Sequence, residues 1–460
     1  MGLLNFIIQS DRRAAFATAS LALLSLSGIV FLLWSGRTAL IGPAYFASAV
    51  LIGGWLYTTA SPLYLGFIVW IWFLTPFLRR VIDYATGTYT PPSRSLVLLT
   101  PFATTILTLL DIPRFGQQLI RRRYLPYFLC FLGVAYGYAI GLVKVGPFGA
   151  TRQLLSWLPP LLTGFYVLNR WHLSEQHVHV IKRVMAWGVL VLGLYGIAQF
   201  YILPAWDAFW IRHAEMASIG QPYPQQVRLF SMLDSPGPFA VTMMTGLILL
   251  FTGADLFVLL AAVPGYVSFL LARVRGAWLG WLVAVGVLIL QTTGRFRTRL
   301  LGTVAAIAVV TVPVVLTSGP IAQKTASRME TFENVEQDGS VQARMRLYRN
   351  APFRIATNPI GWGLGSRSMD SGILTLFWQL GWPGGLLYLL GVGLLLRDVF
   401  RGSSFFTTIV MGIAASYALQ FFAGGQLLSQ ISGVLFWSLT SLAIALELSQ
   451  SSSPRRRVAT

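Results

Sequence analysis

Charged side chains are scarce in this sequence. They account for 11% of the 460 residues, whereas hydrophobic residues account for 55%. A soluble domain carries about 25% charged residues, so this chain cannot cover a soluble surface with the charges it has. The composition therefore excludes a soluble enzyme and a disordered chain. The apolar residues also come in runs that are too long for the alternating strands of a membrane β-barrel.

Cysteine and histidine are also rare. The single cysteine, Cys130, cannot form an intrachain disulfide or a cysteine-based metal site, and we expect it to be a buried apolar residue. The sequence holds no ordered cluster of Asp, His or Cys that would bind a metal ion. It also holds no glycine motif of the kind that binds ATP or NAD. We therefore expect no metal and no cofactor.

Long apolar runs dominate what is present. About fourteen runs approach the ~20 residues that a helix needs to cross a bilayer. They predict an all-α polytopic membrane protein with about 14 (12–14) transmembrane helices, and residues 1–460 as a single membrane domain. The candidate spans are residues 14–34, 39–59, 62–78, 95–110, 125–143, 153–168, 184–203, 238–253, 255–272, 276–292, 299–317, 372–396, 404–423 and 428–447. The first run is longer than a typical signal sequence, so we expect it to be a retained span.

Lys and Arg in short loops mark the cytoplasmic side of a membrane protein. With the N-terminus in the cytoplasm, the basic residues divide evenly, but two long outer loops, 204–237 and 318–371, hold many of the outer ones. Without these loops, the bias favours cytoplasmic N- and C-termini. The two loops are short enough for this rule to apply, so their positive charge on the outer side needs another cause. That charge predicts a bound anion. Lys144, Lys182 and Lys324 are the only lysines, and the excess of Arg fits either a genomic codon bias or bidentate phosphate binding.

The long periplasmic loop 318–371 contains a predicted short amphipathic helix, residues 341–351, which ends at Pro352. Its apolar residues share one face, whereas Arg346 and Arg349 lie on another. A helix of this kind lies at the membrane surface with its arginines near the headgroup phosphates. It is either a plain interfacial anchor or part of a phosphate-binding site.

Four motifs follow one another in the second half of the chain. Residues 227–240 read VRLFSMLDSPGPFA, and residues 272–284 read ARVRGAWLGWLVA. Residues 358–365 read NPIGWGLG, in which three alternate glycines allow tight turns and exposed backbone amides. Residues 370–390 then read DSGILTLFWQLGWPGGLLYLL and open a candidate span.

These motifs together resemble the O-antigen ligase/polymerase-like superfamily, of the WaaL and Wzy type. They cover the core region of that family, residues 227–395. The resemblance implies a GT-C-like fold and a metal-independent membrane glycosyltransferase. Such an enzyme transfers a glycan from undecaprenyl diphosphate to an acceptor on the periplasmic side. By position, Arg275 matches the arginine of the family's Arg-Gly-Ala segment, Arg228 the arginine before its Pro-Asn segment, and Arg344 the arginine in the second half of its long loop.

The predicted chemistry depends on stabilising the negative charge that develops on the diphosphate leaving group. Preorganised arginines supply that stabilisation in a water-poor site. We expect Arg275 and Arg344 to be the main diphosphate ligands, and the further candidates are Arg228, Arg273, Arg346, Arg349 and Arg367. The favoured base for the acceptor hydroxyl is Asp370, which is also a candidate N-cap for the span that follows it. The alternative bases are Glu330, Glu333 and Asp234.

One departure from the family pattern bears on the reaction. Ligases of this family carry a His-Asn or similar pair where this sequence has Asp370-Ser371, and His213 is the only histidine predicted on the periplasmic side. The pattern therefore favours a Wzy-type polymerase, which joins the glycan to the next lipid-linked repeat unit. The alternative is a ligase, which delivers the glycan to lipid A-core.

A transporter is the alternative from another functional class. A flippase or exporter of lipid-linked oligosaccharides would suit the span count, but it would place cationic residues in a central cavity between two similar halves. This sequence has no internal repeat, and its spans hold almost no ionisable groups. The expected location is the bacterial inner membrane. The expected partners are an undecaprenyl diphosphate-linked oligosaccharide and the lipid bilayer, with a chain-length regulator as a further candidate and no nucleic acid.

Overall fold

The computed structural model describes residues 27–28, 31–32, 34–92, 94–114, 122–214, 216, 219–253, 256–317, 339–369, 371–423 and 430–452. The regular secondary structure in these ranges is helical. The only β-pairing among the described residues is an isolated antiparallel bridge between Gly220 and Val227. The helices are α2 (Ile41–Thr58), α3 (Leu63–Thr86), α4 (Thr100–Ile106), α6 (Leu125–Lys144), α7 (Pro147–Asn169), α8 (Ser174–Tyr201), α9 (Ala205–His213), α10 (Pro236–Leu250), α11 (Leu256–Leu271), α12 (Arg275–Gln291), α13 (Gly294–Thr317), α15 (Gly339–Thr357), α16 (Gly372–Phe400), α17 (Phe405–Ala423) and α18 (Gln430–Ser452).

The predicted spans coincide with these helices from 39–59 onward, although 95–110 forms consecutive short helices, and most of the run 14–34 lies outside the described residues. Seven helices in the described part are long and apolar enough to cross a membrane. They are Thr38–Thr58, Leu63–Thr86, Arg122–Lys144, Trp171–Tyr201, Gly372–Phe400, Phe405–Phe422 and Gln430–Ser451. Shorter apolar helices include α10, α11 and α12. An all-helical chain with several candidate membrane spans is thus established, and the GT-C-like fold stays a prediction.

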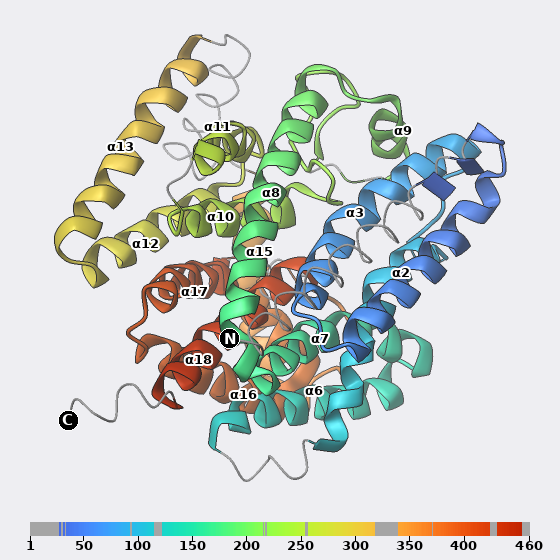
Figure 1. Cartoon of the computed structure of the whole chain (residues 1–460). Coiled ribbons are helices and arrows are strands. Elements are labelled where there is room, and N and C mark those ends of the chain that lie inside the picture. The colour runs from blue at the N-terminus through green and yellow to red at the C-terminus, as the bar shows by residue number, and fades with distance from the viewer. Residues whose placement is uncertain are drawn as a thin grey trace.

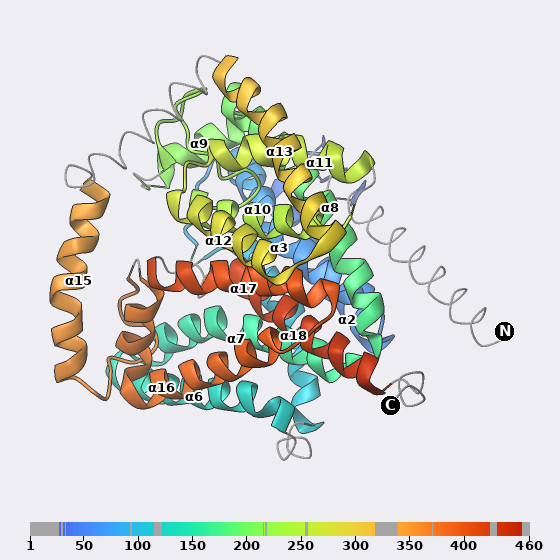
Figure 2. The same ribbon diagram turned by 90° about the vertical axis from the view of Figure 1, so that its left-hand side faces the viewer.

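The helices pack in pairs. α6 lies along α16, α7 along α18, α12 along α17 and α11 along α8 (Figures 1 and 2). Small residues allow the closest of these approaches. On α6, Gly133, Gly137 and Gly141 recur every fourth residue and therefore share one face. A Cβ atom on Gly133 would lie 2.5 Å from the carbonyl oxygen of Gly384 on α16. Small residues at this spacing let membrane helices pack backbone to backbone.

The loop 358–365 fills the junction between α6, α7 and α16. Its three alternate glycines all have positive φ, at 82°, 84° and 89°. A Cβ atom on Gly363 would lie 2.3 Å from the backbone nitrogen of Gly141, and one on Gly365 would lie 2.6 Å from the carbonyl carbon of Gly149. Glycine is required here by both the backbone conformation and the lack of space. The motif NPIGWGLG is therefore a packing element.

Helix α16 is broken at Gly381, where φ is 63° and ψ is −175°. The loop occupies the break, because the Trp382 amide donates to the carbonyl of Pro359 at 2.8 Å. The Trp362 amide likewise donates to the carbonyl of Trp378 at 2.9 Å, and the two indole rings stack with centroids 3.6 Å apart. These bonds satisfy backbone groups that a broken helix would leave unpaired. The expectation of exposed amides in this loop is therefore wrong for Trp362.

The long segment 318–371 also contains a helix that is longer than predicted. α15 has 19 residues and continues through Pro352 to Thr357. It lies beside α16 and across the ends of the main helices (Figure 2). Its C-terminal half packs through Ala351 and Ile355, and the Tyr348 hydroxyl donates to the carbonyl of Phe422 at 2.6 Å. The predicted end at Pro352 is wrong because this packing holds the helix together beyond the proline.

Candidate functional site

Two motifs predicted to bind the diphosphate meet in the structure. The Arg228 guanidinium donates to the carbonyl oxygen of Arg273 at 3.2 Å, and the Arg273 guanidinium donates to the carbonyl oxygen of Val227 at 3.1 Å. Each arginine therefore fixes the backbone next to the other. The pair joins the segment before α10 to the turn between α11 and α12, and so brings together two of the candidate diphosphate ligands, Arg228 and Arg273.

The turn between α11 and α12 is strained. Arg273 has a φ of 54°, which is a costly conformation for a residue with a side chain. The strain turns the chain so that Arg275 becomes the first residue of α12 and is half-buried. The N-terminus of a helix carries a partial positive charge and favours anions. Arg228, Arg273 and Arg275 are thus a cationic group whose backbone setting suits an anionic ligand.

A buried ion pair anchors the segment that carries Arg228. Nε of Arg80, at the end of α3, lies 2.7 Å from a carboxylate oxygen of Asp207 on α9, and both side chains are fully buried. Arg80 also donates to the carbonyl oxygens of Ser231 (2.6 Å) and Leu233. Gln199 donates to Asp207 at 2.7 Å and accepts from the amide of Ser231 at 2.9 Å. The segment 227–235 is therefore held in place by a network of buried polar groups.

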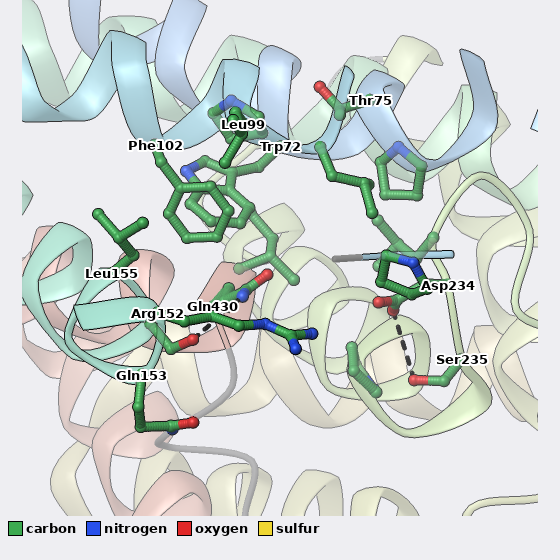
Figure 3. A pocket seen from close by; sticks show the side chains of 18 of the residues that line it. Trp72, Thr75, Leu99, Phe102, Arg152, Gln153, Leu155, Asp234, Ser235 and Gln430 are labelled. Atoms are coloured by element: carbon green, nitrogen blue, oxygen red, sulfur yellow. Dashed lines mark hydrogen bonds between the residues drawn. The ribbon is translucent and has the colours of Figure 1, made fainter. Parts of the chain in front are cut away.

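A cavity of about 540 Å³ opens at the other end of this segment. Its walls come from α3, the start of α4, the first half of α7, residues 233–238 and the start of α18. Among the described residues that line it, Arg152 is the one cationic side chain and Asp234 the one carboxylate. Figure 3 shows the Arg152 guanidinium extending across the cavity toward the side where Asp234 and Ser235 lie.

Asp234 has an unusual setting for a carboxylate. Its side chain is exposed and faces the cavity, where the surrounding walls displace part of the bulk water. Loss of hydration by burial raises the pKa of Asp234 above its ordinary value of 3.8. Its own backbone amide, the charge of Arg80 and the Ser235 hydroxyl offset part of that increase. The Ser235 hydroxyl donates to Asp234 at 3.4 Å.

The remaining predicted residues are only partly placed. Arg349 on α15 and Arg367 in the loop before α16 are exposed. Their proximity to the pair formed by Arg228 and Arg273 stays a prediction. The backbone of Arg344 and Arg346 lies in α15, and their side chains lie outside the described part. Asp370, Glu330 and Glu333 also lie outside it.

The predicted N-cap at Asp370 is wrong, because another residue has that role. Ser371 precedes α16 in an extended conformation, and its hydroxyl accepts from the amide of Leu374. The segment on the other side of Asp370 is also fixed, since Met369 and Thr375 exchange hydrogen bonds of 2.9 and 3.1 Å. Cys130, by contrast, is fully buried as predicted.

Arg80, Asp207 and Arg152 were missed as site residues by the sequence reasoning. Only 15 residues of the chain are acidic. Because acidic residues are rare, an aspartate in a loop predicted to be periplasmic could have marked Asp207 as a candidate. Arg152 carried no such signal, because it is one of many outer arginines and only the fold shows that it faces the cavity. In the ranges that the structure describes, no three of His, Cys, Asp and Glu lie close enough together to hold a metal ion.

Comparison with known families adds to this geometry. Residues 256–389 match the Wzy_C family, described as O-antigen ligase. The predicted resemblance to the O-antigen ligase/polymerase superfamily is confirmed over this segment. The match contains Arg273, Arg275, the glycine-rich loop and the broken part of α16, whereas the segment around Arg228 precedes it. No curated protein matches the chain.

Proposed function

We propose that this chain is a membrane glycosyltransferase that polymerises O-antigen or exopolysaccharide. It transfers a glycan from undecaprenyl diphosphate to the next lipid-linked repeat unit on the periplasmic face of the inner membrane. The observation that carries the proposal is the contact between Arg228 and Arg273, which joins two family-like motifs in one cationic group beside Arg275. The family match supports a polymerase or ligase type of reaction.

The chemistry follows from the charge of the leaving group. In the transfer, a new bond forms between the acceptor oxygen and the anomeric carbon, and the bond from that carbon to the diphosphate oxygen breaks. The electron pair leaves with the diphosphate, whose negative charge grows in the transition state. Arg275 and Arg344 stabilise that charge, and Arg228, Arg273, Arg346, Arg349 and Arg367 are the further candidate ligands of the diphosphate. Arginine suits this role because its planar fork donates two parallel hydrogen bonds to phosphate.

Substitution of the two main arginines tests the proposal. We expect Arg275→Ala and Arg344→Ala to remove long polymer from cells, because losing one donor to a developing anion typically slows such reactions by about 10²–10³. The measurement is the glycan ladder on a gel, together with the amount of inserted protein. Arg297→Ala and Arg401→Ala are the matched controls, since both arginines are exposed on the predicted cytoplasmic side. Normal chain length in the Arg275 and Arg344 variants would refute the proposal.

A ligase is the second candidate, because the matching family is described as O-antigen ligase. Deletion of the gene separates the two reactions. Loss of a polymerase leaves single repeat units on the lipid carrier or on their acceptor. Loss of a ligase leaves full-length polymer on undecaprenyl diphosphate. Mass spectrometry of the lipid-linked glycans distinguishes these outcomes.

A further inference from the structure

The cavity that faces Asp234 differs in chemistry from the arginine group. Its described lining contains a carboxylate, which would repel a diphosphate, and a single guanidinium. Arg228, Arg273 and Arg275 do not line it. A diphosphate is therefore better placed at the arginine group, and the cavity suits a ligand without phosphate. Its volume of about 540 Å³ falls in the range of roughly 300–1,000 Å³ that small-molecule sites occupy.

The cavity lining matches the surface of a sugar. Hydroxyl and amide groups line one part of it, from Gln153, Ser156, Ser235 and Gln430, and Gln430 donates to the Ser156 hydroxyl at 3.4 Å. Aromatic rings line another part, where Trp72 and Phe102 pack edge to face with centroids 5.2 Å apart (Figure 3). A pyranose ring has polar hydroxyls around its rim and apolar C–H faces, so it satisfies both kinds of lining. An acyl chain would offer no hydrogen bond to the Arg152 guanidinium or the Asp234 carboxylate, and covering these charged groups with it would cost free energy.

The position of the cavity connects it to the arginine group. Segment 227–235 carries Arg228 at one end and Asp234 at the other, and the buried pair of Arg80 and Asp207 fixes its middle. The Arg152 side chain is exposed, and no hydrogen bond or ion pair ties it to another residue of the described part. A ligand in the cavity would therefore lie between a guanidinium and a carboxylate, on the same predicted face of the membrane as the arginines.

We propose that this cavity binds the acceptor glycan, with Arg152 hydrogen-bonded to the sugar and Asp234 accepting the proton of the attacking hydroxyl. This inference rests on the proposed function. As the acceptor oxygen attacks the anomeric carbon of the donor, its proton passes to the Asp234 carboxylate, while the diphosphate leaves toward the arginine group with the electron pair. The proton then passes to water. The position of this exposed carboxylate inside the cavity supports the role, and its raised pKa agrees with it, because a base with a raised pKa holds a proton better near neutral pH.

The test uses the full-length protein in lipid nanodiscs. The donor is the lipid-diphosphate-linked repeat unit of the source strain, and the acceptor is the same oligosaccharide released from its lipid and blocked at the reducing end. We expect Asp234→Asn to lower the transfer rate by about 10²–10⁴. We expect Arg152→Ala to raise the KM for the acceptor about tenfold and to leave the KM for the donor unchanged. Asp398→Asn and Arg212→Ala are the controls, because these residues do not line the cavity.

The pH dependence of the transfer rate distinguishes a base from a residue with only a structural role, because a structural role would not change that dependence. Asp234 must be ionised to accept a proton, so the rate falls as the pH drops through its pKa. Because burial raises that pKa, the acidic limb should lie above 3.8, the ordinary value for this carboxyl. The limb should disappear in Asp234→Asn. A limb that persists in this variant and disappears in Asp370→Asn would assign the proton to Asp370 and overturn the role of Asp234.

A binding measurement separates failure of this inference from failure of the proposed function. The blocked oligosaccharide should bind in saturation-transfer NMR without any donor. Leu99→Trp should weaken that binding, because Leu99 lines the cavity and the larger ring would fill it. Transfer by the wild type with unchanged rates and acceptor KM in the variants would overturn the inference alone. No transfer by the wild type would overturn the proposed function. Acceptor binding that is absent, or that Leu99→Trp does not change, would overturn the cavity assignment in either case.

Discussion

At the scale of single residues, the buried pair of Arg80 and Asp207 is expected to stabilise the packing of α3, α9 and segment 227–235. Removing one partner leaves an uncompensated buried charge, which typically costs about 3–5 kcal/mol. We therefore expect Arg80→Met to lower the thermal unfolding temperature in detergent and to impair activity, because Ser231 and Leu233 lose their donor.

A matched control exists in the pair of Arg397 and Asp398, which lie 2.9 Å apart with their side chains 35% and 28% exposed. Partly exposed pairs contribute about 0–1 kcal/mol, so Arg397→Met should change the unfolding temperature little. Equal shifts for the two substitutions would contradict the role assigned to Arg80. The two variants share the same chemical change, but Arg80 is buried and also bonds two backbone carbonyls, whereas Arg397 is partly exposed and bonds Asp398.

Some of the candidate site residues could be identified from the sequence alone, and others could not. Arg228, Arg273 and Arg275 could be singled out as candidates, because they occur in motifs with fixed spacing. The partnership of Arg80 with Asp207 could not, since the two residues lie on helices far apart in the chain and meet only through folding. Asp234 was one of three alternative bases, and its position in the cavity distinguishes it from an ordinary loop aspartate.

At the scale of helices, the packing on the glycine-lined face of α6 is expected to be sensitive to substitution. A Cβ atom on Gly141 would lie 2.4 Å from the carbonyl oxygen of Leu364 and 2.8 Å from its nitrogen, and both are backbone atoms. Overpacking of this kind costs about 1–3 kcal/mol. We expect Gly141→Ala to lower the unfolding temperature and to displace the glycine-rich loop.

The control for this substitution is Gly393→Ala on α16, where a Cβ atom would meet nothing within 4 Å. Alanine is favoured over glycine in a helix by about 1 kcal/mol, so this variant should be as stable as the wild type or more stable. A loss of stability in Gly393→Ala as large as that in Gly141→Ala would contradict the packing argument. Thermal unfolding of both purified variants provides the measurement.

The helices could be predicted from the apolar runs, because a hydrophobic segment of that length in a membrane has few alternative structures that pair its backbone groups. Their interruptions could not. The break at Gly381 depends on the loop that fills it, and the continuation of α15 through Pro352 depends on burial of Ala351 and Ile355. α3 likewise extends beyond the predicted span to Thr86, where Arg79 pairs with Asp83 at 3.5 Å. In α16 and α15 a tertiary contact decided what local propensity left open, whereas the pair in α3 is a local i,i+4 contact within the helix.

At the scale of the whole molecule, contacts between loops bear on the predicted topology. Two loops can meet at one membrane surface only if an even number of crossings separates them. Contacts in the described residues join segments predicted outside, namely Arg80 with Asp207, Arg228 with Arg273, and Lys144 with Gly361. Others join segments predicted inside, namely Asp111 with Arg170, Lys182 with Thr252, and Ser174 with Ser449. This agreement supports the predicted alternation of sides.

The single cysteine makes that alternation directly measurable. Cys130 is fully buried, so the wild-type protein should react little with a membrane-impermeant maleimide. Tyr223→Cys and Asn350→Cys introduce thiols at exposed positions that we predict to be periplasmic, and Thr298→Cys and Arg401→Cys introduce them at exposed positions that we predict to be cytoplasmic. In cells with a permeabilised outer membrane, the first two should be labelled at once and the last two only after the inner membrane is disrupted. Because the arginine group and the cavity share the side of Tyr223, labelling of Tyr223→Cys only after disruption would place the proposed site in the cytoplasm, where a periplasmic acceptor could not reach it.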